Sequence, residues 1–126
     1  MTDTTRRRLD AERRTAATAK QISWQRRGTA LLGEMLARAA AEGLPAIAWT
    51  IGSADAGLAG RCEARHMDQR RQDFNAWRLA VGTWAGQGAD AKREYADNSG
   101  AVRLVDQWDR FEGVNITLTA DIWAEG

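Results

Sequence analysis

Several residue types that mark common classes of protein are scarce in this chain of 126 residues. Its single cysteine, Cys62, cannot form an internal disulfide, which excludes the small disulfide-stabilised domains of secreted proteins. No apolar run approaches the roughly 18–20 residues that a membrane-spanning helix needs. The arginines near the start are not followed by an apolar stretch, so we expect no secretory signal. These absences predict a soluble protein of the cytoplasm.

Histidine is equally scarce, because His66 is the only one. A Ser-His-Asp or Cys-His mechanism would have to use it. Cys62 and His66 lie about 13 Å apart along an extended chain, so a catalytic pair would need a sharp turn between them. A metal centre would have to add Glu63 or Asp68, and the paired spacing of structural zinc ligands is missing. There is also no glycine-rich phosphate-binding motif. We therefore expect no catalytic residue, no metal and no cofactor.

Tryptophan and arginine, in contrast, are abundant. Only Lys20 and Lys92 among the 18 basic residues are lysines. Together with the frequent alanine, this bias is typical of a GC-rich bacterial or phage genome. Tryptophan is buried more often than not, so we expect most of the six to lie in a core. They are Trp24, Trp49, Trp77, Trp84, Trp108 and Trp123.

The net charge of +1 hides an uneven distribution. Residues 1–27 carry eight basic and three acidic side chains, and the remainder carries ten basic and fourteen acidic ones. Residues 1–17 are polar and predict a basic arm, either a frayed helix or a disordered segment. Its arginines are the candidate contacts to nucleic acid or to a partner, although short basic termini also serve solubility. They are Arg6, Arg7, Arg8, Arg13 and Arg14.

Two segments have helical periodicity. Apolar residues recur every three or four positions over 18–42, and Gly43 followed by Pro45 predicts the end of that helix. A second helix is expected over 69–81, with Asp68 as its N-cap and Gly82 at its end.

The strands follow a period of two. A hairpin is expected from 46–51 and 58–64, and a three-stranded meander from 92–97, 102–111 and 114–123. The sequence therefore predicts an α+β fold for residues 18–126, with the order α-β-β-α-β-β-β. The expected sheet is five-stranded and mostly antiparallel, with both helices on one face.

This arrangement predicts a core and an open sheet face. The expected core comprises Leu32, Met35, Leu36, Ile47, Trp49, Phe74, Trp77, Val81, Ile116 and Leu118. Two helices cover only one face of such a sheet, so Trp123 and either Trp108 or Phe111 should lie on the other. An open face with aromatics at its centre is typical of an interface. The alternative is a bulge that turns the strand over 102–111 and buries both of its sets of side chains.

Three hypotheses of function follow. The first is a small non-enzymatic protein-interaction protein, accessory or regulatory, from a phage or mobile element. It would bind a protein partner, or a second copy of itself, through Trp108, Phe111 and Trp123. The alternative is a nucleic-acid-binding accessory protein that uses the basic arm. A small-ligand-binding or enzymatic domain is the third. No motif in the chain is specific enough to name a family.

Overall fold

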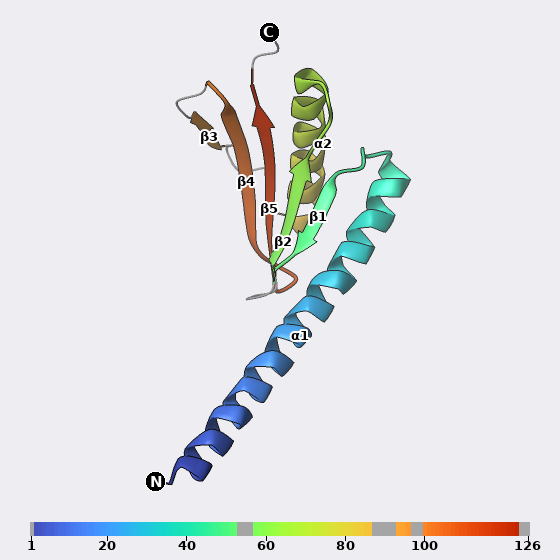
Figure 1. The fold of residues 1–126 in the computed structure, drawn as a ribbon. Helices are drawn as coiled ribbons and strands as arrows, with labels where there is room; N and C mark the ends of the chain where they lie inside the picture. The colour runs from blue at the N-terminus through green and yellow to red at the C-terminus, as the bar shows by residue number, and fades with distance from the viewer. Residues whose placement is uncertain (1, 53–56, 87–92, 97–99, 124–126) are drawn as a thin grey trace.

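The structure is a computed structural model that describes residues 2–52, 57–86, 93–96 and 100–123 (Figure 1). It contains, in chain order, α1 (Asp3–Glu42), β1 (Ala48–Ile51), β2 (Gly57–Cys62), α2 (Met67–Ala85), β3 (Arg93–Ala96), β4 (Val102–Phe111) and β5 (Val114–Ile122). The predicted α+β class, with two helices, is confirmed.

The strands form one sheet in the order β1-β2-β5-β4-β3. The β1–β2, β4–β5 and β3–β4 pairs are antiparallel, but β2 and β5 are parallel. The sheet is therefore mixed, where the sequence predicted a mostly antiparallel one. A parallel pair requires a long crossover, and the segment that contains α2 provides it between β2 and the meander.

Helix α1 is longer than predicted, because it begins at Asp3 and runs without a break to Glu42. The hydroxyl of Thr2 caps it by accepting from the backbone N–H of Thr5 at 3.3 Å. The expected arm is thus the first part of this helix. The end falls where it was predicted: Gly43 takes a left-handed φ of 72°, and its N–H donates to the carbonyl of Ala39.

Helix α2 differs from its prediction at both ends. It begins at Met67, so Asp68 lies in the first turn and not at the N-cap, which is His66. A carboxylate in this turn still interacts favourably with the helix dipole. The helix also passes through Gly82, which is buried, and ends before Gly86 at a left-handed φ of 69°. Trp84 lies in this added turn and contacts Trp77 edge-on, with ring centroids 6.1 Å apart.

Both helices pack against the same face of the sheet. Helix α2 contacts β2, β4 and β5, and the C-terminal part of α1 contacts β1, β2 and β5 (Figure 1). The largest buried side chains are Trp77, Trp108, Phe74, Met35, Leu58, Leu104, Ile116, Leu118, Val81 and Val114. One core therefore joins the two helices to the three central strands.

One predicted core residue is wrong. Leu36 is 46% exposed, whereas Leu31 is buried. The buried positions of α1 are Gly28, Leu31, Met35 and Ala39. Each helical residue turns by about 100°, so Leu36 lies to the side of a stripe centred on Met35. Leu32, Ile47 and Trp49 are only partly buried, at the edge of the core.

Candidate interaction site around Trp123

The sheet face opposite the helices, here called the open sheet face, is mostly polar. Strand alternation and register place the following side chains on it: Ala48, Thr50, Ala59, Arg61, Arg103, Val105, Gln107, Asp109, Asn115, Thr117, Thr119 and Asp121. Threonine, amide and charged groups keep their hydrogen-bonding capacity in water, so most of this face needs no covering partner.

The prediction that either Trp108 or Phe111 lies on this face with Trp123 is wrong. Trp108 is 1% exposed and Phe111 is 7% exposed, and both belong to the core. The cause is a bulge between them, at which the β4–β5 register shifts by one residue. Arg110 within it has a φ of 59°, and its N–H donates to Asn115 Oδ1 at 3.0 Å. The bulge turns Phe111 back to the face of Trp108. Neither residue can therefore serve as a surface contact in this fold.

The same bulge decides which residues meet further along the hairpin. It places Arg103 opposite Asp121, one position away from the partner that an unshifted hairpin would give. The Arg103 guanidinium donates Nε to Asp121 Oδ1 at 2.7 Å and Nη2 to Oδ2 at 3.0 Å. This bidentate bond is the main reason why the pKa of Asp121 lies below its ordinary value.

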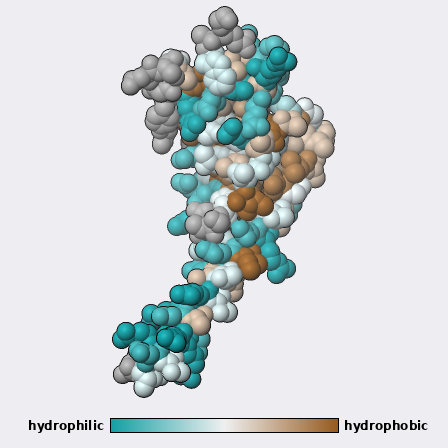
Figure 2. All heavy atoms as spheres, viewed as in Figure 1, coloured by the Kyte–Doolittle hydropathy of each residue, from teal (hydrophilic) through white to brown (hydrophobic). Residues whose placement is uncertain are grey.

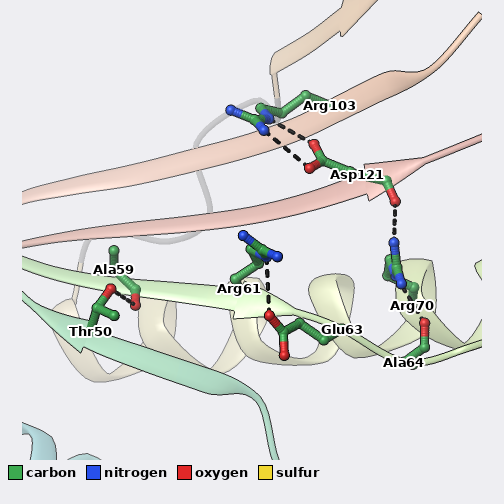
Figure 3. Close-up of polar contacts among 8 residues, drawn as sticks. All are labelled: Thr50, Ala59, Arg61, Glu63, Ala64, Arg70, Arg103 and Asp121. Carbon is green, nitrogen blue, oxygen red and sulfur yellow. Dashed lines mark hydrogen bonds and ion pairs between the residues drawn. The ribbon is translucent and has the colours of Figure 1, made fainter.

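Arg70 joins α2 to the carboxyl ends of the two parallel strands (Figure 3). Its Nε donates to the carbonyl of Ala64 at 2.9 Å, and its Nη1 donates to the carbonyl of Asp121 at 2.8 Å. The guanidinium is therefore held between the segments that follow β2 and end β5. Trp123, which follows β5, lies with its ring 4.8 Å from the Arg70 guanidinium carbon, a cation–π contact.

Trp123 was expected on the surface, and its side chain is 47% exposed. It lines two hollows. One has a volume of about 280 Å³ and is lined by Arg61, Cys62, Glu63, Arg70, Asp121 and Trp123. The other has a volume of about 460 Å³ and is lined by Met67, Asp68, Arg71, Gly100, Val102, Ile122 and Trp123. The indole therefore stands between the two hollows.

Arg61 and Glu63 complete the surroundings on the side of β2. Arg61 Nε lies 3.1 Å from Glu63 Oε1, and both side chains are more than half exposed (Figure 3). We call the surface made by Arg61, Glu63, Arg70, Arg103, Asp121 and Trp123 the Trp123 patch. It contains an aromatic ring, three guanidinium groups and two carboxylates, so it can offer both apolar and charge-assisted contacts.

The only cysteine and the only histidine lie near this patch. Cys62 is 1% exposed, and its burial, with a smaller contribution from Asp73, raises the pKa of its thiol to about 12. A thiol with this pKa stays protonated at neutral pH and is a poor nucleophile. His66 is exposed at the start of α2. In the part of the chain that the structure describes, no three His, Cys, Asp or Glu side chains are grouped so that they could hold a metal ion.

The arginines of the predicted arm lie on the first turns of α1. Arg6, Arg7, Arg8, Arg13 and Arg14 are all exposed. Arg8 lies 4.0 Å from Glu12, an exposed pair of the i,i+4 type that contributes little to stability. These five residues belong to a different region from the Trp123 patch (Figure 1).

Sequence reasoning found Trp123 but missed its neighbours Arg70, Arg103 and Asp121. The alternation of residues 114–123 does place Asp121 on the outward side with Trp123. The partner of Asp121 depends on a bulge, and the reach of Arg70 depends on where α2 packs. Neither is visible in a local pattern.

Comparisons with family models, with curated proteins and with solved structures found no match to the chain. Among the helices of the described segments, none has both the length and the apolar character needed to cross a membrane.

Proposed function

We propose that this chain is a small non-enzymatic protein-interaction protein, accessory or regulatory, that binds its partner through the Trp123 patch. The observation that carries the proposal is an indole that is 47% exposed and rests on an arginine with two backbone hydrogen bonds. Tryptophan and arginine are the residues most enriched among those that dominate binding energy at interfaces.

The geometry supports this proposal because hydrogen bonds within the chain already hold two arginines of the patch. Arg70 is held by the carbonyls of Ala64 and Asp121, and Arg103 is held by the carboxylate of Asp121. Immobilising a rotamer-rich side chain on binding costs about 0.5–1.5 kcal/mol. A partner that meets these groups in their bound positions avoids much of that cost.

The hollows on the two sides of Trp123 indicate what the partner presents. Met67, Val102 and Ile122 give the larger hollow an apolar component, which suits an aliphatic or aromatic side chain packed against the indole. The smaller hollow contains Arg61 and Arg70 beside Glu63 and Asp121, which suits a group that both donates and accepts hydrogen bonds, such as a backbone amide. The occupant that fits both is a protein surface, either of another protein or of a second copy of this chain.

The test compares Trp123→Glu with Leu79→Glu. Leu79 is a matched control because it is another exposed large hydrophobic residue, at 58%, on the far part of α2. Sedimentation of the wild-type chain over a range of concentrations detects a second copy, and affinity capture with quantitative mass spectrometry detects another protein.

We expect wild-type and Leu79→Glu to give the same association, and Trp123→Glu to lose it with an unchanged circular dichroism spectrum. Retention of every partner and of any self-association by Trp123→Glu would contradict the proposal. Equal losses in both variants would also contradict it, because they would indicate non-specific contact through exposed apolar groups.

A further inference from the structure

The first part of α1 contains no buried residue, and it meets the domain at Trp24 and Arg27. The first buried residue of the helix is Gly28, and no position from Asp3 to Arg27 is buried. These 25 residues extend about 37 Å at a rise of 1.5 Å per residue. Figure 1 shows this segment, in blue, projecting from the domain, and Figure 2 shows hydrophilic side chains covering its N-terminal end. It is therefore a rod with a mostly polar surface, on which Ile22 is 51% exposed.

Four basic residues follow one line along this rod. Arg6, Arg13, Lys20 and Arg27 are each separated by seven positions, and all four are exposed. Seven residues of a straight helix fall about 20° short of two full turns, so the four side chains stay within about 60° of one another. Neighbouring members are about 10.5 Å apart along the axis, and the line spans about 31 Å. We call these four residues the basic ridge.

The other basic residues of the rod lie elsewhere on its circumference. Arg7, Arg8, Arg14 and Arg26 lie outside this line, and Arg8 has Glu12 within 4.0 Å. Two acidic residues lie beside the ridge: Asp10 is one turn from both Arg6 and Arg13, and Asp3 is one turn from Arg6. Four basic groups against these two neighbouring carboxylates leave the ridge side of the rod with a net positive charge.

The base of the ridge touches the domain. A Cβ built on Gly113, in the β4–β5 turn, would lie 3.3 Å from Arg27 Nη1, so this guanidinium lies against the turn. Lys20 lies with its ammonium 5.1 Å from the ring centre of Trp24, which packs at the edge of the core. These contacts fix the positions of Lys20 and Arg27. Arg6 and Arg13 continue the same line toward the N-terminus.

We propose that the basic ridge binds the phosphate backbone of duplex nucleic acid, at a site separate from the Trp123 patch. A duplex is a stiff polyanion with one charge per about 1.7 Å of axis, so basic groups along a rigid rod can each meet a phosphate. Single strands are bound chiefly by stacking of bases on aromatic rings. Trp24 is the only aromatic residue among residues 1–27, and it is half-buried beneath Lys20. The rod therefore has the chemistry for a duplex backbone, without readout of base sequence.

The test measures the binding of the full chain to a fluorescent duplex longer than the rod, and to one of its single strands, at several salt concentrations. Four phosphate contacts predict a slope of about −3.6 in a plot of log affinity against log salt. This slope corresponds to a loss of about 150-fold in affinity between about 50 and 200 mM salt. We expect the single strand to bind more weakly than the duplex.

Two quadruple variants with the same change of charge separate the ridge from general attraction. The ridge variant carries Arg6→Gln, Arg13→Gln, Lys20→Gln and Arg27→Gln, and the control carries Arg7→Gln, Arg8→Gln, Arg14→Gln and Arg26→Gln. Glutamine keeps a similar helix propensity, which circular dichroism verifies. The ridge variant should lose duplex binding and most of the salt slope, whereas the control should keep a slope near −3.6.

Three results would overturn the inference: equal losses in the two variants, tighter binding of the single strand, or no binding by the wild-type chain. Trp123→Glu should bind the duplex as the wild type does. The two proposals are therefore tested independently. Loss of the duplex-binding inference would not affect the proposed protein contact at Trp123, and loss of that contact would not affect the basic ridge.

Discussion

Replacement of Trp77 by alanine should be among the most damaging single changes in this fold. Its side chain is 1% exposed, and its Nε1 donates to the carbonyl of Pro45 at 2.7 Å. Its ring meets Trp49 edge-on at 5.3 Å and Trp84 at 6.1 Å. It therefore connects α2 to the segment between α1 and β1.

The magnitude follows from these contacts. Truncation of a buried tryptophan to alanine costs about 3–5 kcal/mol, through lost burial and the cavity that remains. The hydrogen bond to Pro45 contributes about 0.5–1.5 kcal/mol, and each edge-on aromatic pair contributes a similar amount. We expect Trp77→Ala to lower the free energy of unfolding by about 4–5 kcal/mol, near the upper end of that range. Trp77→Phe keeps a ring and loses the hydrogen bond, so we expect about 2 kcal/mol.

Leu36→Ala is the control, because the sequence placed Leu36 in the core and the structure leaves it 46% exposed. Its cost should stay below about 1 kcal/mol, since alanine is also the better helix former. Urea denaturation followed by circular dichroism measures all three variants as shifts of midpoint at constant slope. Similar midpoints for Leu36→Ala and Trp77→Phe would refute this account of the core. If Trp77→Ala does not fold, the phenylalanine variant still decides the question.

Two further predictions concern Cys62 and the glycines. Because burial raises the pKa of the Cys62 thiol to about 12, the folded chain keeps this proton in a pH range where the unfolded chain loses it. The free energy of unfolding should therefore fall as the pH rises above about 8.5. In the same urea assay, Cys62→Ala should lose less stability between neutral and alkaline pH than the wild type does, and equal losses in the two chains would contradict this. Gly60→Ala should destabilise by about 1–3 kcal/mol, because the new Cβ would lie 2.8 Å from Leu118 Cδ2 and 2.9 Å from Trp49 Cη2. A Cβ added at Gly33 would have no neighbour within 4 Å, so Gly33→Ala should stabilise α1 by about 0.5–1 kcal/mol. Changes in stability of the same sign for Gly60→Ala and Gly33→Ala would contradict the packing described.

Local patterns predicted much of this fold. The Gly43 and Pro45 pair marked the end of α1, and the alternation over residues 114–123 marked β5. Such signals are local because they depend on a single helix end or a single strand. Pairings between distant segments were harder. The parallel β2–β5 pair depends on the path of the α2 crossover, which no short window of residues contains.

The candidate site shows the same division. Alternation placed Trp123 outward, and the structure leaves it exposed. Trp108 and Phe111 were misplaced because Arg110 adopts a positive φ and shifts the hairpin register by one residue. Arginine rarely takes this conformation, so its side-chain type gives no sign of it. The contact between Arg70 and Trp123 joins a helix to a strand end, and only the packed fold brings them together.

The most direct test of the Trp123 patch is the dissociation constant of the recovered complex, with another protein or with a second copy, for two alanine variants. A residue at the energetic centre of an interface costs about 2 kcal/mol or more on truncation, so Trp123→Ala should weaken binding by roughly 30-fold or more. Leu79→Ala, at a hydrophobic position that is 58% exposed, should leave the constant almost unchanged. A Trp123→Ala chain that is folded and binds with the affinity of the wild type would contradict the claim that this patch is the interaction site.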